Sequence, residues 1–92
     1  MNLIIEMTDN IGMDYYYVTM YCEGQILIID TPDRRIKELR RQIPICALEE
    51  VHWQVNGSIR RLVFRYQNET YSIVDMGTIG AIAENLMIQT LV

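Results

Sequence analysis

Residues 49–75 read EEVHWQVNGSIRRLVFRYQNETYSIVD, and this stretch decides the fold that we expect for the chain. Apolar and polar side chains alternate on both sides of Asn56-Gly57, a dipeptide typical of a two-residue β-hairpin turn. We expect strands at 49–55, 59–67 and 70–74, with a second turn at Asn68-Glu69. A helix from about 77 to 89 follows, with Asp75 as its N-cap.

The hairpin turn also predicts which side chains face the core. A loop made of Asn56 and Gly57 places Val55 opposite Ser58 and Trp53 opposite Arg60. The face expected to point toward the core consists of Val51, Trp53, Val55, Leu62, Phe64 and Tyr66. Near the tip, Arg60 is expected to lie over the Trp53 ring in a cation–π contact.

The N-terminal half of the chain shows the same order of signals. Strands are expected at 2–8, 15–22 and 25–30, with a tight turn at Glu23-Gly24. A first helix is then expected, because Asp30 or Thr31 can cap it and Pro32 suits a first helical position. Its apolar stripe would be Ile36, Leu39 and Ile43, and Pro44 would end it.

The two halves align at an offset of 45 residues, with matches at turns, inward strand positions and helix caps. The matched pairs are Leu3/Leu48, Gly12/Gly57, Val18/Val63, Tyr21/Tyr66, Ile28/Ile73 and Asp30/Asp75. We therefore expect a single α+β domain over residues 1–92, built as a tandem βββα-βββα pseudo-repeat with halves at 1–45 and 46–92. Its antiparallel sheet would have about six strands, with two helices on one face. The alternative is two half-domains that merely follow the same local rules.

Composition narrows the class of protein. Half of the 92 residues are apolar and 22% are charged, which excludes intrinsic disorder, and no apolar run is long enough for a membrane span. The N-terminus lacks the features of a signal peptide, so a cytoplasmic location is the default expectation. The net charge is −4, although the segment 33–42 nets +3 and the rest of the chain −7. An acidic balance argues against non-specific binding to nucleic acid.

No residue pattern predicts catalysis, a cofactor or a metal site. His52 is the sole histidine and has no recognisable nucleophile to serve. Cys22 and Cys46 lie in apolar surroundings and, with His52, give too few ligands for zinc, so we expect two reduced, buried structural thiols. The alternative is a disulfide or a redox role. The segment MGTIG at 76–80 lacks a phosphate-binding lysine and is interpreted as a structural turn. We expect a protein that is not an enzyme.

The C-terminal helix is predicted to form an interface, because apolar residues occupy more than one of its sides. One sheet in a small domain covers one side of a helix, so a second copy of the chain would cover the rest. The predicted dimer or partner interface consists of Ile79, Ile82, Leu86, Met87 and Leu91. The alternative is that a curved sheet encloses the helix within one chain.

Two further groups are candidate partner-binding residues. Alternation places Tyr15, Tyr17 and Tyr21 on the face of their strand opposite to Val18 and Met20. Tyrosine gives a large contact area at low entropic cost, although ordinary sheet packing would explain the same pattern. Nucleic acid is not expected to bind there, because residues 1–33 contain no basic side chain. The other group, Arg34, Arg35, Arg40 and Arg41, would form either a solvated helix face or a contact for an acidic partner or a phosphate backbone.

These features together predict a small acidic, non-enzymatic protein-binding module, expected to be a homodimer. It would act as an inhibitor or regulator of the antitoxin, immunity or anti-defence type by occupying the surface of another protein. The alternative is a small subunit or assembly factor that docks permanently in a larger complex through its apolar C-terminal helix.

Overall fold

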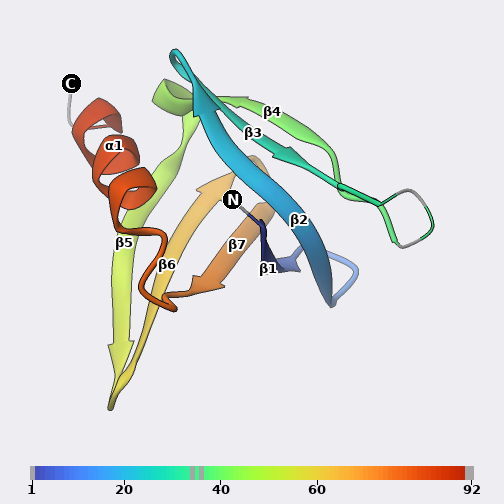
Figure 1. Ribbon diagram of the computed structural model, residues 1–92, viewed down its shortest axis with the longest axis horizontal. Coiled ribbons are helices and arrows are strands. Elements are labelled where there is room, and N and C mark those ends of the chain that lie inside the picture. The colour runs from blue at the N-terminus through green and yellow to red at the C-terminus, as the bar shows by residue number, and fades with distance from the viewer. Residues whose placement is uncertain (1, 34, 36, 91–92) are drawn as a thin grey trace.

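The computed structural model describes residues 2–33, 35 and 37–90, and these residues form one strongly curved antiparallel sheet and one α-helix (Figure 1). The sheet has seven strands in the order β4-β3-β2-β1-β7-β6-β5. The elements are β1 (Asn2–Thr8), β2 (Met13–Glu23), β3 (Ile26–Asp30), β4 (Arg41–Pro44), the 3-10 turn η1 (Ile45–Ala47), β5 (Glu49–Asn56), β6 (Ile59–Tyr66), β7 (Glu69–Val74) and α1 (Gly80–Thr90).

The sheet bends into a half-barrel, and the core lies on its inner side. Alternation along each strand sends one set of side chains inward, as the pairs Met20/Ile29, Leu27/Ile43 and Phe64/Tyr71 show. Phe64 and Tyr71 are fully buried, and their rings stack with centroids 5.2 Å apart. The remaining core residues are Ile5, Met7, Val18, Leu39, Ile45, Leu48, Leu62, Ile73, Ile79, Ala83 and Leu86.

The prediction of a first helix is wrong, and with it the prediction of two helices on one face. Residues 41–44 form β4, and among the described residues of 31–40 no helix is present. The buried Thr31 hydroxyl donates to the Leu39 carbonyl and accepts a hydrogen bond from the Leu39 N–H, which pins the two ends of this loop together. Ile43 completes the sheet by pairing with Leu27, a long-range gain that outweighs helix propensity.

The pseudo-repeat is also not shown. β1 lies in the middle of the sheet, whereas β5, its expected equivalent in the second half, lies at an edge. The first half ends in a loop and β4, whereas the second half ends in α1. The described residues therefore form a mostly β half-barrel with a single helix, and the matches at an offset of 45 do not correspond to a structural repeat.

The β5–β6 hairpin confirms the predicted faces but not the predicted register. Asn56 pairs with Ile59, so the turn consists of Gly57 and Ser58, and Trp53 lies opposite Leu62. Gly57 has φ +64°, the conformation that the first turn position of a type II′ hairpin requires. The predicted side chains still share one face of the hairpin, but Val55 near the tip is 66% exposed and does not reach the core. The predicted cation–π contact is confirmed, because the Arg60 guanidinium carbon lies 3.6 Å from the Trp53 ring centroid.

The helix α1 fills the concave side of the half-barrel beside β5 and η1 (Figure 1). Ala83 and Leu86 are fully buried on it, and Ile79, just before its first residue, is almost fully buried. Asp75 accepts a hydrogen bond from the Gly77 N–H, so it shapes the loop before the helix rather than capping the helix itself.

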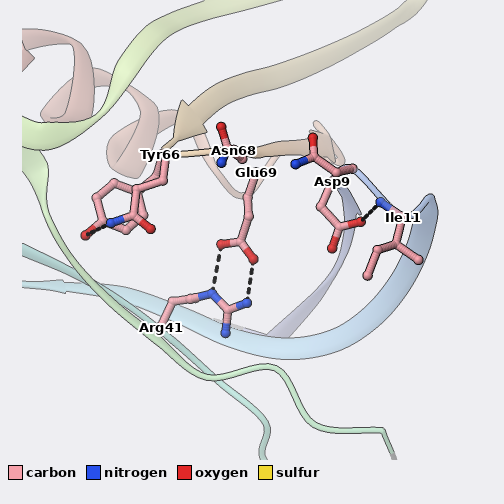
Figure 2. A pocket seen from close by; sticks show the side chains of 8 residues that line it. Asp9, Ile11, Arg41, Tyr66, Asn68 and Glu69 are labelled. Atoms are coloured by element: carbon pink, nitrogen blue, oxygen red, sulfur yellow. Dashed lines mark hydrogen bonds and ion pairs between the residues drawn. The ribbon is translucent and has the colours of Figure 1, made fainter.

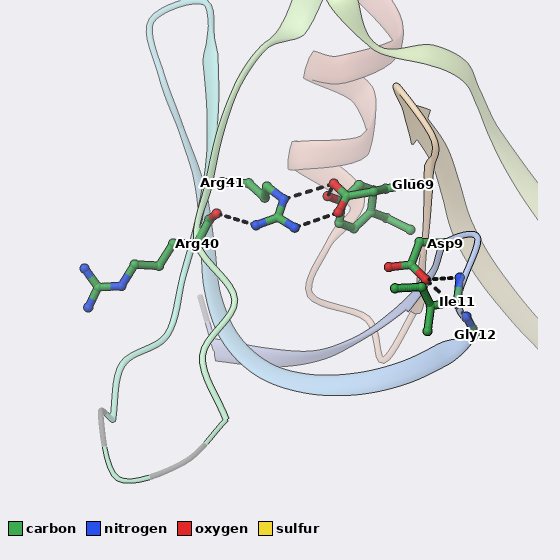
Figure 3. Close-up of polar contacts among 7 residues, drawn as sticks. Asp9, Ile11, Gly12, Arg40, Arg41 and Glu69 are labelled. Atoms are coloured by element: carbon green, nitrogen blue, oxygen red, sulfur yellow. Dashed lines mark hydrogen bonds and ion pairs between the residues drawn. The ribbon is translucent and has the colours of Figure 1, made fainter.

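A polar clasp joins two distant strands at one end of the half-barrel (Figures 2 and 3). Arg41 of β4 and Glu69 of β7 form a two-pronged ion pair, with Nε and Nη2 lying 3.0 and 2.6 Å from the two carboxylate oxygens. The Tyr71 hydroxyl donates to Glu69, and Arg41 Nη1 donates to the Arg40 carbonyl. These hydrogen bonds satisfy most of the polar atoms in the clasp.

The clasp shifts the pKa values of its three side chains, Arg41, Glu69 and Tyr71. Hydrogen bonding to Glu69 raises the pKa of Arg41, and the same hydrogen bonds hold the pKa of Glu69 below its usual range. Burial raises the pKa of Tyr71, and its hydrogen bond to the Glu69 carboxylate adds to the increase. The clasp is thus most stable with Glu69 ionised and Tyr71 neutral.

We expect Glu69→Gln to weaken the fold at neutral pH and to reduce its sensitivity to acid. Because the folded pKa of Glu69 is lowered, its stabilisation is complete above the unfolded pKa near 4.5 and disappears as pH falls through the folded value. The loss at pH 7 should be about 1–2 kcal/mol, since both side chains retain contact with solvent. Urea unfolding from pH 7 to pH 3 measures both effects. Glu84→Gln, on the exposed side of α1, is the control. Parallel pH curves for wild type and Glu69→Gln would show that the clasp has no role.

We expect Leu86→Ala to lower the free energy of unfolding by about 2–5 kcal/mol, because it leaves a cavity beneath α1. Ile88→Ala is the matched control on the same helix, because Ile88 is 56% exposed and its truncation should change stability by less than about 0.5 kcal/mol. Chemical denaturation compares the two variants. Equal losses would mean that α1 is not seated in the half-barrel.

Candidate protein-binding face

The outer face of the sheet carries the three tyrosines that alternation singled out. Tyr15, Tyr17 and Tyr21 are 58%, 44% and 42% exposed, whereas Val18 and Met20 between them are fully buried. The prediction that these tyrosines share the face away from the core is therefore confirmed by their burial pattern.

Neighbouring strands extend this aromatic row into a larger surface. Ile4 of β1 lies directly opposite Tyr17, and Ile28 of β3 lies opposite Tyr21. We use the name tyrosine face for the exposed outer residues Ile4, Tyr15, Tyr17, Tyr21, Ile26, Val74 and Met76. Clusters of exposed apolar side chains on a folded domain mark interaction sites more often than single ones do.

A hollow of about 550 Å³ lies within the tyrosine face. Ile4, Tyr15, Tyr17, Val74 and Met76 line it together with the Glu6–Arg61 pair. The loop 75–79 borders the hollow, and it is fixed because the Asp75 N–H donates to the Arg60 carbonyl at 2.7 Å. Gly77 has φ +90°, a conformation that a residue with a side chain rarely adopts, and this turn carries Met76 to the hollow.

Charges at this face occur in pairs. Arg61 Nη1 lies 3.2 Å from Glu6 Oε2 inside the hollow. Arg40 pairs with Asp30 at 3.3 Å. Lys37 pairs with Asp14 on the opposite side of β2, where it lies over the Tyr16 ring that packs against the core. The result is an apolar, aromatic surface whose neighbouring charges neutralise one another, which is the pattern of a protein-binding hot spot with a polar rim.

Of the arginines singled out in the sequence, the described ones, Arg35, Arg40 and Arg41, do not gather into one basic surface. Arg41 belongs to the clasp inside the half-barrel. Arg35 is highly exposed and binds Asp33, whose carboxyl pKa this hydrogen bond lowers, and Arg40 turns toward Asp30. Arg34 lies outside the described residues. An acidic partner would therefore meet cations that already have carboxylate neighbours.

The residues of the predicted helix interface lie mostly against the protein's own core. Ile79 and Leu86 are buried, and Ile82 and Met87 are half-buried and pack on the core. Leu91 lies outside the described residues. Among the described residues, the apolar surface that this helix can offer to another chain consists of Ala81, Ile82, Met87 and Ile88. Self-association through this helix stays a prediction.

Polar side chains outside the tyrosine face include His52, Asp9 and Cys22. His52 is exposed, and its Nδ1 lies 2.5 Å from the Glu50 carbonyl oxygen. A second hollow of about 430 Å³ lies at the clasp, where Asp9 accepts hydrogen bonds from the Ile11 and Gly12 N–H groups (Figures 2 and 3). Burial raises the pKa of the half-buried Cys22 thiol, whereas Cys46 is exposed, so the prediction that both thiols are buried is wrong for Cys46. Within residues 2–33, 35 and 37–90, no three His, Cys, Asp or Glu side chains form a potential metal site.

Alternation could not have revealed the contribution of β1 and β7 to the tyrosine face. Ile4 and Val74 meet in the hollow because β1 pairs with β7, a contact between the two ends of the sequence. The only local signal was a run of apolar residues in β1, which predicts a strand but not its neighbour.

Comparisons with protein-family models, with curated proteins and with solved structures find no match to this chain. Within the described part of the chain, the one α-helix is too short to cross a membrane. The tyrosine face is therefore the feature of the described residues that indicates a function.

Proposed function

We propose that this protein is a non-enzymatic binding module that holds a partner protein on its tyrosine face. The observation that carries the proposal is the hollow of about 550 Å³, lined by Ile4, Tyr15, Tyr17, Val74 and Met76 around a neutralised ion pair. A protruding apolar side chain of the partner would enter this hollow, while the tyrosine hydroxyls make hydrogen bonds at its margin. Such an arrangement combines a central apolar side chain that is buried away from water with a rim of polar groups.

A protein fits this face better than a nucleic acid does. A nucleic-acid strand needs cations that can reach its phosphates, together with aromatic rings for its bases. Here the rings are present, but Arg61 and Arg40 each have a carboxylate partner. Opening those pairs to bind phosphate would leave Glu6 and Asp30 beside the strand, where they would repel it.

Binding by occupancy is a mode of action that requires no chemistry from the module itself. A small acidic domain that covers a functional surface of another protein acts as an inhibitor or regulator, in the manner of antitoxins, immunity proteins and anti-defence proteins. The rigid sheet supports this mode, because its outer side chains are positioned before binding and little ordering entropy is lost.

We expect the double variant Tyr15→Ser, Tyr17→Ser to fold as the wild type does and to lose affinity for the partner by a factor of about 100 or more, since central tyrosines often contribute 2 kcal/mol or more each. Ile11→Ser is the matched control, because Ile11 is 97% exposed and lies outside the tyrosine face. Cross-linking and capture from the cells of origin with all three proteins would identify a partner. Titration calorimetry with that purified partner would then give the affinities.

The proposal requires one pattern of results. The partner must be retained by the wild type and by Ile11→Ser, and lost by the tyrosine double variant while its circular dichroism spectrum is unchanged. A partner that binds the double variant as tightly as the wild type would refute the assignment of this face.

A further inference from the structure

One edge of the sheet, β5, offers backbone groups for pairing. Asn56 and Ile59 flank the two-residue turn and form a hydrogen-bonded pair, and the pairs Gln54/Arg61 and His52/Val63 follow in the same phase. The N–H and C=O groups of Trp53 and Val55 therefore point away from β6, toward the open side of β5. Among the described strands, β5 has a neighbour on its β6 side only.

The two edges of the sheet differ in how they resist pairing with another chain. The opposite edge, β4, has four residues, ends in Pro44 and is preceded by the basic residues Lys37 and Arg40. Short length, proline and charge are the usual devices that protect an edge strand. From Val51 to Asn56, β5 has no charged residue and no proline. From Val51 to Asn56, the β5 edge thus lacks the proline and the charged side chains that protect the β4 edge.

The sequence of this edge is nearly palindromic in polarity. Residues 51–55 read VHWQV, with Trp53 at the centre, valine at both ends and a neutral polar residue on each side of the tryptophan. A strand of this kind is complementary to an antiparallel copy of itself, because a twofold axis through Trp53 brings like classes of residue together.

We infer that β5 pairs with β5 of a second copy of this chain, in an antiparallel register that places Trp53 opposite the partner's Trp53. Val51 then lies opposite the partner's Val55, and His52 lies opposite the partner's Gln54. On one face, this pairing covers Val55, which is 66% exposed in the single chain. On the other face, it joins an imidazole to an amide without opposing like charges.

Features at both ends of the segment limit the pairing to this register. Glu50 has φ 55° and lies in a register shift between Glu49 and His52, so regular strand geometry begins after it. Gly57 turns the chain at the other end. In the inferred register Glu50 lies opposite the partner's Asn56, so the negative charge meets an amide. The hairpin end of β5 extends beyond α1, which lies beside the half of the strand that follows η1 (Figure 1).

The inference does not depend on the tyrosine face, which is formed by β1, β2, β3, β7 and the loop after β7. A twofold axis perpendicular to the joined sheet leaves the outer faces of both copies on the same side. The dimer would therefore present two tyrosine faces in one direction, and it could bind a partner that has two equivalent sites.

The first test removes one edge-facing N–H without changing the β5–β6 ladder. In Val55→Pro, the lost N–H is one that points to the open edge, where proline is tolerated. Val55→Thr keeps the N–H and the β-branched shape, so it is the matched control. Sedimentation equilibrium over a concentration series should show a dimer for wild type and Val55→Thr. The dissociation constant of Val55→Pro should be about 10- to 100-fold higher, because the symmetry doubles the loss. A wild type that stays monomeric throughout, or a Val55→Pro dimer as tight as the wild type, would overturn the inference.

The second test reads the register and remains informative if the proline variant fails to fold. In the inferred dimer, residues 52 and 54 of opposite copies form a non-hydrogen-bonded pair with Cα atoms about 4.5 Å apart, within the range of a disulfide. Proteins carrying His52→Cys and Gln54→Cys are prepared separately, each with the exposed Cys46 changed to Ser. After mild oxidation, an equal mixture should form the disulfide-linked dimer about tenfold faster than either protein alone. Equal rates in all three samples would exclude this register.

Discussion

The ion pair between Arg41 and Glu69 joins two strands that three others separate in the sheet. β4 and β7 can approach each other only if β3, β2 and β1 curve around the space between them. The two-pronged geometry and the Tyr71 hydroxyl leave few polar atoms of the pair unsatisfied, which a partly buried ion pair requires if it is not to destabilise the fold. The curvature that results gives α1 a concave surface instead of a flat one.

Because the sheet is curved, the apolar surface of α1 does not by itself indicate an interface with another chain. A flat sheet covers one side of a helix, and the remaining apolar side chains would then require another chain. In the half-barrel, Ile79, Ala83 and Leu86 are enclosed, while Ile82 and Met87 are half-buried at the border. The outer face of the sheet and the β5 edge carry the exposed aromatic and valine side chains, so these are the surfaces on which we base the binding proposals. The two surfaces are formed by different residues, so loss of binding at one of them would not affect binding at the other.

Local signals in the sequence predicted much of the sheet. Alternation located six strands to within two residues at each end, and it placed Tyr15, Tyr17 and Tyr21 on the outer side. The segment 31–44 was mispredicted because Ile36, Leu39 and Ile43 have helical spacing, and because Leu27, the residue that draws Ile43 into a strand, is distant in the sequence. Of these residues, Ile36 itself lies outside the described part of the chain. The hairpin register was displaced because Gly57 takes the first turn position, where Asn56 was expected.

The candidate site was predictable only where it is local. The tyrosines follow from one strand, but the hollow needs Ile4 and Val74, which come together because the first and last strands in the sequence, β1 and β7, are neighbours in the sheet. Sheet curvature is likewise a property of the assembled sheet, and no dipeptide or periodicity encodes it. Without knowledge of this curvature, the sequence could not show which side of α1 is enclosed and which is exposed.

The pairing of β1 with β7 also has a consequence for biosynthesis. Residues 2–8 receive their second neighbour only when residues 69–74 have been made, and the concave side stays open until residues 80–90 follow. Folding of a sheet whose central pair spans most of the chain is slow compared with folding through local contacts. During synthesis, the apolar side of the N-terminal strands therefore stays uncovered until the C-terminal residues emerge from the ribosome. Chaperones that recognise such segments have time to bind in that interval.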